Sequence, residues 1–285
     1  MIELKHEVGR AVSLWTGEQL LCRYVYDPQV PANESPKPYF HPVNSLAGDT
    51  LTNFRPNDHP WHHALSLTLN SVSGVNFWGG PTCIRGEGYK MLNNHGAQHH
   101  VAWQQLEVSE GRTASLVHTL EWRHASEVIF TEERTLRILI DQAAGSWSLQ
   151  WLSRLKNVSG RTLSLGNPHS EAGLAGSHYT GLQFRGAREL LDDHLDATIK
   201  VVAEGGLEGV PAVHGASARW MEWHGQMDTT LNRVVIRFEN NAGPLHWFMR
   251  RNNPLAAFPI QFDQNREVPA GETLVIDHTL TFKQV

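Results

Sequence analysis

The sequence lacks the features that cross-link a chain, anchor it in a membrane or attach it to a charged polymer. Its 285 residues include two cysteines, Cys22 and Cys83, too few for a disulfide framework and not spaced as metal ligands. No apolar run approaches the roughly 18 residues of a membrane-spanning helix. The formal charge is −5 and no lysine or arginine run occurs. We therefore expect no nucleic-acid or membrane partner, but a small neutral or polar molecule.

The N-terminus also lacks a targeting signal. The first residues, MIELKHEVGR, are acidic where a signal peptide would carry a basic region followed by an apolar one. We therefore expect a cytoplasmic protein. Its oligomeric state is left open by the sequence.

Convincing amphipathic helices are missing as well, and strand patterns take their place. Apolar and polar residues alternate in about fifteen short segments joined by turns, a pattern typical of antiparallel sheet. The most regular segments are 101–108, 114–122, 128–140, 147–155 and 274–282. The pattern predicts one all-β domain over residues 1–285, a large two-sheet antiparallel β-sandwich. One short helix is expected at 188–196.

Histidine is abundant, with 17 residues, and three of them fall in one short stretch. Asp58-His59-Pro60-Trp61-His62-His63 places three imidazoles and a carboxylate within six residues, just before the alternating segment 65–69. The alternation predicts a half-buried strand. Pro60 stiffens the backbone that presents the histidines. This stretch is therefore the leading candidate for a functional site.

Proton transfer is the first chemistry that these residues could perform. Histidine titrates near neutral pH, and a partly buried carboxylate can be shifted to meet it. We expect His62 or His169 as the general acid and Glu171 or Asp263 as the base; His169 and Glu171 would share a face if their segment is extended. Arg55 and Arg185 are expected to bind an anionic or oxyanionic group.

Metal binding and sugar binding are the alternatives. A divalent metal would use histidines from the cluster and elsewhere, with His41, His59 and His63 as candidate ligands and His62 or His169 in support. Beyond that metal, the sequence specifies no cofactor. Carbohydrate recognition would use the faces of Trp61 and Trp78, with Asp58 and Arg185 binding hydroxyl or acidic groups. A non-catalytic carbohydrate-binding protein is the third reading.

The central stretch carries a family resemblance. Residues 58–65, DHPWHHAL, and 73–78, SGVNFW, resemble the DHPHHRGL and NGxDFW motifs of a bacterial PmoA-like family of unknown function, of the DUF6807 type. Residues 179–186, YTGLQFRG, and 269–274, PAGETL, resemble its later motifs. Trp61 replaces a motif histidine, and His63-Ala64 replaces the Arg-Gly pair, so Arg55 or Arg185 would have to substitute for that arginine.

The resemblance implies a galactose-mutarotase-like supersandwich. Enzymes of that fold act on sugars through a histidine and a carboxylate in the concave sheet, so the resemblance implies a carbohydrate-processing enzyme, an epimerase, hydrolase or lyase. The glutamate that aldose epimerases carry near the C-terminus has no clear equivalent here, and Asp263 is the nearest acid. Fold-level analogy leaves the reaction open.

Overall fold

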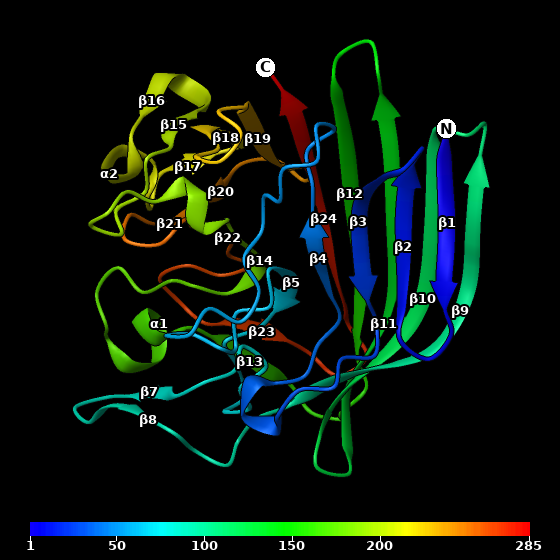
Figure 1. Ribbon diagram of the computed structural model, residues 1–285. Coiled ribbons are helices and arrows are strands. Elements are labelled where there is room, and N and C mark those ends of the chain that lie inside the picture. Colours follow the sequence, from blue (N-terminus) through cyan, green and yellow to red (C-terminus); the bar gives the residue numbers. More distant parts are fainter.

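The computed structural model describes all 285 residues, and most of them lie in antiparallel strands (Figure 1). Two large sheets dominate. One has nine strands in the order β16-β15-β18-β19-β24-β12-β11-β10-β9, and the other has eight in the order β1-β2-β3-β4-β5-β14-β22-β21. The predicted all-β, two-sheet antiparallel sandwich is confirmed.

The nine-stranded sheet contains the long regular strands that the alternation predicts. In spatial order its members are β16 (Leu207–Glu208), β15 (Lys200–Ala203), β18 (Trp220–Gln226), β19 (Arg233–Asn240), β24 (Thr273–Gln284), β12 (Ser146–Asn157), β11 (Glu127–Asp141), β10 (Thr113–His124) and β9 (Ala97–Ser109). In β24, buried residues alternate with more exposed ones at Leu274, Ile276, His278, Leu280 and Phe282. Period-2 alternation places these five on the face that turns to the core.

The eight-stranded sheet is assembled from shorter strands. They are β1 (Ile2–Glu7), β2 (Ala11–Thr16), β3 (Gln19–Val25), β4 (Tyr39–Val43), β5 (Leu65–Thr68), β14 (Gly181–Arg185), β22 (Leu255–Phe258) and β21 (Phe248–Arg250). One cluster of 54 buried apolar residues draws on both large sheets and forms the main core.

Small sheets and short helices surround this framework. The small sheets contain β23 (Arg266–Val268), β13 (Leu163–Gly166) and β6 (Ser71–Val72); β17 (Ser217–Ala218) and β20 (Leu245–His246); and β7 (Thr82–Ile84) and β8 (Gly88–Lys90). The helical turns are α1 (Pro168–Ala172), α2 (Val210–Val213), η1 (Ala32–Glu34), η2 (Arg188–Leu190) and η3 (Glu204–Gly206). Helix α1 contacts β7 (Figure 1). The structure has 24 strands rather than about fifteen, because many are too short to show alternation. None of the helices is long and apolar enough to cross a membrane.

Strand β5 is more buried than its alternation predicts. The expectation was a half-buried strand, yet Ser66 and Thr68 are as buried as the leucines between them. Gln183 donates a hydrogen bond to the Ser66 hydroxyl, and Thr68 donates to the carbonyl of Gly181. Both faces of this part of the sheet are therefore covered, and its polar side chains bond across to β14.

A second, smaller hydrophobic core cluster covers the outer face of the sheet around β5. In β22, Ala256 and Phe258 join the main core, whereas Leu255 and Ala257 pack with Trp78 and Phe248. Because successive strand residues point to opposite faces, this second cluster lies on the outer face of the eight-stranded sheet. Trp61 and Tyr179 pack against it.

The helix prediction needs correction. Residues 188–196 contain one 3-10 turn, η2, and the α-helical turns lie at 168–172 and 210–213 instead. Helix α1 forms because Asn167 accepts hydrogen bonds from the amides of His169 and Ser170, and Pro168 occupies the first helical position. His169 and Glu171 are therefore helical and do not share the face of an extended segment.

Candidate functional site

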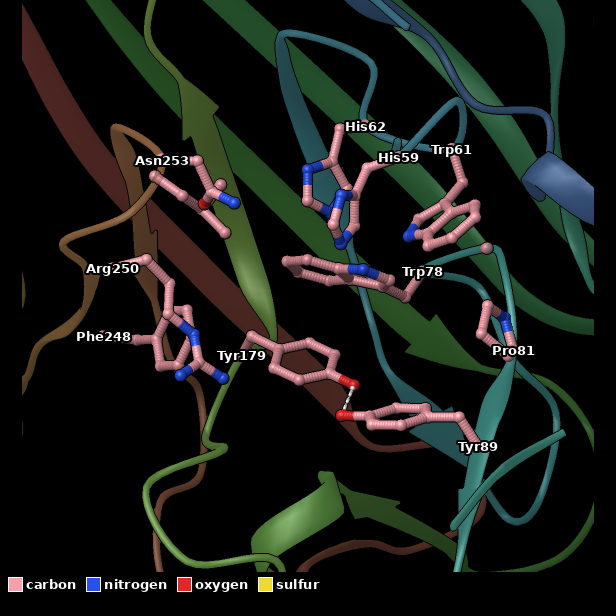
Figure 2. A pocket seen from close by; sticks show the side chains of 12 residues that line it. His59, Trp61, His62, Trp78, Pro81, Tyr89, Tyr179, Phe248, Arg250 and Asn253 are labelled. Atoms are coloured by element: carbon pink, nitrogen blue, oxygen red, sulfur yellow. Dashed lines mark hydrogen bonds between the residues drawn. The ribbon is translucent and has the colours of Figure 1, made fainter. Parts of the chain in front are cut away.

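A pocket of about 340 Å³ opens beside the second core (Figure 2). Five aromatic residues, two histidines, an arginine and an asparagine supply most of its wall: Trp61, Trp78, Tyr89, Tyr179, Phe248, His59, His62, Arg250 and Asn253. The hydroxyl groups of Tyr89 and Tyr179 are hydrogen-bonded at 2.9 Å. The wall thus combines flat apolar surfaces with polar groups, a composition typical of small-molecule sites.

Two glycines seat Trp61 in the wall. Gly79 and Gly80 have φ values of +99° and +69°. A Cβ atom on Gly79 would lie 2.7 Å from Trp61 Cβ, and one on Gly80 would lie 2.4 Å from the indole ring. Any side chain at either position would displace Trp61 or strain the backbone. The Gly79-Gly80 pair that follows Trp78 is therefore part of the pocket's construction.

A buried lysine holds the loop that carries Trp78. The Lys37 ammonium group is fully buried and donates to the carbonyl oxygens of Glu34, Ser35 and Trp78 at 2.8, 2.9 and 2.9 Å. An ammonium group has three protons and no acceptor, so these bonds satisfy it completely. Lys37 therefore ties the segment before β4 to the pocket wall.

His62 is held by Arg185, which reaches it from β14. Both side chains are buried, and Arg185 Nη1 donates to His62 Nδ1 at 3.3 Å. A guanidinium group has no acceptor, so Nδ1 carries the lone pair and the ring proton sits on Nε2. Burial, and next the positive charge of Arg185, lower the pKa of His62 well below its ordinary value. His62 is therefore a neutral imidazole with one N–H free to donate.

His59 lies beside His62 and faces a carboxylate. The two imidazole rings are 4.8 Å apart between centroids. His59 Nδ1 lies 2.9 Å from Asp58 Oδ2. Burial raises the pKa of Asp58, but His59, a backbone hydrogen bond and the charge of Arg185 together outweigh this and leave the pKa lowered. An ionised Asp58 therefore faces one nitrogen of His59, which leaves the other nitrogen for the pocket.

Buried polar atoms of the pocket's lining have no hydrogen-bond partner within the protein. They are Asn253 Oδ1 and His59 Nδ1, and Nε of Arg185, which lies beside His62, has no partner either. A buried donor or acceptor without a partner destabilises a fold by about 1–3 kcal/mol, and such groups are rare in native proteins. The Asn253 side-chain oxygen is thus available to accept a hydrogen bond from a ligand in the pocket.

The structure brings several of the predicted site residues together and separates others. Trp61, Trp78 and His62 line the pocket, while Asp58 and Arg185 contact its histidines. Arg55 is instead paired with Glu34 through bonds of 2.6 and 2.9 Å and does not line the pocket. The catalytic and binding roles assigned to these residues remain predictions.

The three candidate metal ligands do not meet at one point. His41 Nδ1 pairs with the Thr52 hydroxyl at 3.0 Å, and His63 Nε2 pairs with Glu34 at 3.0 Å. His59 faces Asp58 in the pocket. Each histidine has a different neighbour, so these residues share no ligand position, and a metal bound by them remains a prediction.

The remaining predicted residues lie around α1. Glu171 accepts hydrogen bonds from Ser71 and Asn265, and burial raises its pKa. His169 and Asp263 lie near each other, with Nε2 and Oδ1 3.6 Å apart. None of the three lines the pocket. The acid and base roles predicted for them also remain predictions.

Sequence reasoning missed several pocket residues. They are Tyr89, Tyr179, Phe248, Arg250 and Asn253. Tyr179 had a signal, because it begins the 179–186 motif. The other four lie in segments without a motif, and only the packing of β21, β22 and the β7–β8 hairpin brings them to Trp61.

The fold and pocket define an all-β sandwich protein with an aromatic-lined pocket. The chain belongs to a family of unknown function (DUF6807), whose model matches residues 11–284. No curated protein matches the sequence.

Solved structures resemble the chain distantly. The galactosidase domain of the alpha-galactosidase-sucrose kinase AgaSK is 8% identical, with a TM-score of 0.41; the match covers 100% of this chain and 40% of that one. A galactose mutarotase related enzyme from Lactobacillus acidophilus is also 8% identical, with a TM-score of 0.29, and the match covers 99% and 97% of the two chains. This chain spans less than half the length of the first relative, so function has to be argued from the site.

Proposed function

We propose that this protein is a carbohydrate-processing enzyme that binds a sugar or sugar derivative in the pocket around Trp61 and Trp78. One observation carries the proposal: aromatic walls and unpaired polar groups meet in the same small cavity. A sugar ring has apolar C–H faces and polar edges. It can therefore satisfy both kinds of surface at once.

The size of the pocket favours a small sugar. Its volume of about 340 Å³ lies near the lower end of the roughly 300–1,000 Å³ common for ligand sites. Trp61 and Trp78 offer indole surfaces to C–H groups, while the Asn253 carbonyl oxygen can accept from a hydroxyl group. The pocket suits one or two sugar units better than a polymer chain.

His59 and His62 supply complementary halves of a proton transfer. Asp58 Oδ2 lies 2.9 Å from His59 Nδ1 without hydrogen-bond geometry. Rotation of the carboxylate into line with an Nδ1–H would leave His59 Nε2 as a base. Arg185 leaves His62 with an Nε2–H that donates to a developing oxyanion. A base beside a neutral donor fits proton abstraction next to a carbonyl or carboxyl group. We therefore favour an epimerase or a lyase over a hydrolase.

Binding of a sugar panel tests the first half of the proposal. Neutral aldoses, ketoses and uronic acids should be titrated by calorimetry against the wild type, Trp61→Ala and Trp220→Ala. Loss of one stacking surface should weaken binding about tenfold, or ~1.4 kcal/mol. Trp220 is the matched control, because it lies on β18 against Arg237, away from the pocket. Equal affinity in the wild type and Trp61→Ala would place the sugar elsewhere.

Turnover of the sugar that binds tests the second half. His59→Gln and His62→Gln should each abolish proton exchange into the sugar, followed by NMR in D₂O. Binding should persist in both variants, because the stacking surfaces remain. A protein that binds the sugar but shows no exchange or turnover would be a carbohydrate-binding protein without this chemistry.

A further inference from the structure

Three side chains from separate segments converge beside α1. His169 lies in α1, His178 precedes β14, and Asp263 follows β22. Asp263 Oδ1 lies 3.4 Å from His178 Nε2 and 3.6 Å from His169 Nε2, and all three ligand atoms fall within 4.8 Å of one another. Within the whole chain, no other group of three histidine, cysteine or acidic side chains comes this close.

These distances suit an ion better than a shared proton. A charged N–H···O hydrogen bond is usually about 2.7–2.9 Å long, and neither imidazole makes one with Asp263. Ligand atoms 2.0–2.1 Å from a tetrahedral zinc ion lie ~3.3 Å from one another. The two separations from Asp263 Oδ1, 3.4 and 3.6 Å, are close to that value, and the separation of the two histidine ligand atoms does not exceed 4.8 Å.

The imidazole nitrogens of this cluster are unsatisfied. His178 is only 6% exposed, and neither of its ring nitrogens has a hydrogen-bond partner. Nδ1 of His169 is also buried without a partner. An imidazole whose ring nitrogens have no hydrogen-bond partner can offer a lone pair to a cation.

Hydrogen bonds fix the three backbone segments relative to one another. The Asn167 side chain caps α1 and also donates to the carbonyl of Phe262 at 2.8 Å. The amide of His169 donates to the carbonyl of Ser177 at 3.1 Å. The Phe262 ring stacks on His178, with centroids 3.7 Å apart and planes 8° from parallel. The cluster is therefore held in place before any ligand arrives.

We propose that His169, His178 and Asp263 bind one divalent transition-metal ion, of the class of zinc or iron(II). Two imidazoles and one carboxylate are a donor set that such ions prefer, and they leave coordination positions for water or a substrate oxygen. Calcium and magnesium are disfavoured because they prefer oxygen ligands. His214 is not a further ligand through Nδ1, since that atom accepts from the amide of Met249.

The site lies next to the aromatic pocket but does not share its lining. Tyr179, which follows His178, belongs to the pocket wall, and Arg250 of that wall donates to the Ser177 hydroxyl at 3.3 Å. None of the three ligands lines the pocket itself. The metal site therefore stands whether or not the pocket binds a sugar.

Titration with the metal alone tests this proposal. Protein stripped with a chelator and dialysed should bind one Zn²⁺ per chain by calorimetry, and Co²⁺ should add visible absorption bands. His169→Gln and Asp263→Asn should each weaken Zn²⁺ binding roughly 100-fold or more, since loss of even an outer-shell partner costs about 10–100-fold. The Asp263 side chain is 72% exposed and that of His169 is 32% exposed. Neither substitution should change the unfolding temperature of the metal-free protein.

His224→Gln is the matched control. His224 also faces a carboxylate, Glu222, at 3.0 Å, but on the exposed surface of β18. Its loss should leave Zn²⁺ affinity unchanged. The proposal is overturned if the stripped protein binds no stoichiometric Zn²⁺, or if Asp263→Asn binds as tightly as the wild type. It is also overturned if His59→Gln abolishes the binding that Asp263→Asn leaves intact. These measurements use the metal alone and no sugar. The metal-site proposal can therefore be overturned while the sugar-processing proposal stands, and the reverse also holds.

Discussion

Two buried arginines on different sheets show how differently one side chain can be used. Arg134 lies in β11, is 0% exposed, and bonds through all three nitrogens: Nε and Nη2 to Glu132 at 2.7 and 2.8 Å, Nη1 to Tyr24 and Nη2 to Gln98, both at 3.0 Å. Arg185 lies in β14, is 3% exposed, and makes one side-chain bond, to His62. Its Nε has no partner.

The pKa values of the two guanidinium groups follow this difference. Burial disfavours the charge on Arg134, but Glu132 and Tyr24 outweigh it and raise the pKa of Arg134. Burial lowers the pKa of Arg185 to about 10, because the attraction of Asp58 is too weak to compensate. The charge on Arg134 is compensated by Glu132, within a hydrogen-bond network that joins the two sheets. The charge on Arg185 is available to the pocket.

The Arg134 network also links elements far apart in the sequence. Tyr24 comes from β3 of the eight-stranded sheet, and Gln98 comes from β9. Glu132 also accepts from the indole of Trp122 at 2.7 Å and from the Ser153 hydroxyl. A fully satisfied polar network of this kind specifies how two sheets pack.

The largest expected effect comes from breaking this network. Arg134→Leu leaves Glu132 buried without its partner, and removing one member of a buried ion pair destabilises a protein by about 3–5 kcal/mol. Denaturant-induced unfolding should show this loss of free energy. Arg137→Leu is the control, because Arg137 lies on the same strand but is exposed, where substitutions change stability by about 0.5 kcal/mol or less. A loss below about 1 kcal/mol for Arg134→Leu would mean that the network does not stabilise the fold.

An intermediate effect is expected at His278, a core residue that resembles Arg185 in having unpaired buried nitrogen. It is 5% exposed, stacks on Phe258 at 4.2 Å, and both ring nitrogens lack hydrogen bonds. Burial lowers its pKa from an ordinary 6.5 to about 3. Below pH 6.5, His278 is therefore protonated in the unfolded chain but stays neutral in the folded chain until the pH approaches 3. As the pH is lowered from 6.5 to about 3, the free energy of unfolding should therefore decrease. This residue contributes up to ~1.4 kcal/mol per pH unit to the decrease.

Unfolding measured across that pH range checks the prediction. His278→Phe removes the titrating ring and should make the dependence shallower by nearly one proton, although His41 and His63, each with a pKa near 4, still contribute. The exposed His99→Phe is the control and should leave the slope unchanged. An unchanged slope in His278→Phe would show that His278 can be protonated in the folded protein.

The smallest effect on stability is expected at Arg185 itself. Arg185→Met removes a buried charge that has one hydrogen bond, so the free energy of unfolding should change by less than about 1 kcal/mol in either direction. The pKa of His62 should rise, because a neighbouring positive charge is lost, yet stay below its ordinary value because the ring is still buried. Nitrogen-15 NMR of His62 reports both its tautomer and its pKa. If Arg185→Met were as unstable as Arg134→Leu, the two arginines would have the same role.

The main features of the fold could be predicted because they follow from local pattern. Alternation marks β9 to β12 and β24, and antiparallel pairing follows from the short turns between them. The outer cover of β5 could not be predicted, since Ser66 and Thr68 read as solvent-facing until β14 and the second core pack on them. Helix α1 was missed because five residues are too few for a helical period, although Asn167 and Pro168 are recognisable start signals.

The candidate site could be predicted in part for the same reason. The dense group from Asp58 to His63 is visible in the sequence, and it does supply His59, Trp61 and His62 to the pocket. His63 belongs to the same motif, yet it bonds to Glu34 instead. His62 and His63 are adjacent in the sequence but have different neighbours, and only the surrounding fold decides which of them lines the pocket.

Taken alone, the sequence determined the all-β class, most long strands, the titratable stretch 58–63 and the family. These properties depend on residue type and on spacing along a few neighbours. Tertiary structure alone decided that Arg185 meets His62 across 123 residues and that His169, His178 and Asp263 converge. Contacts between distant segments depend on how whole sheets pack and on which loops cover them. No local pattern along the chain encodes that arrangement.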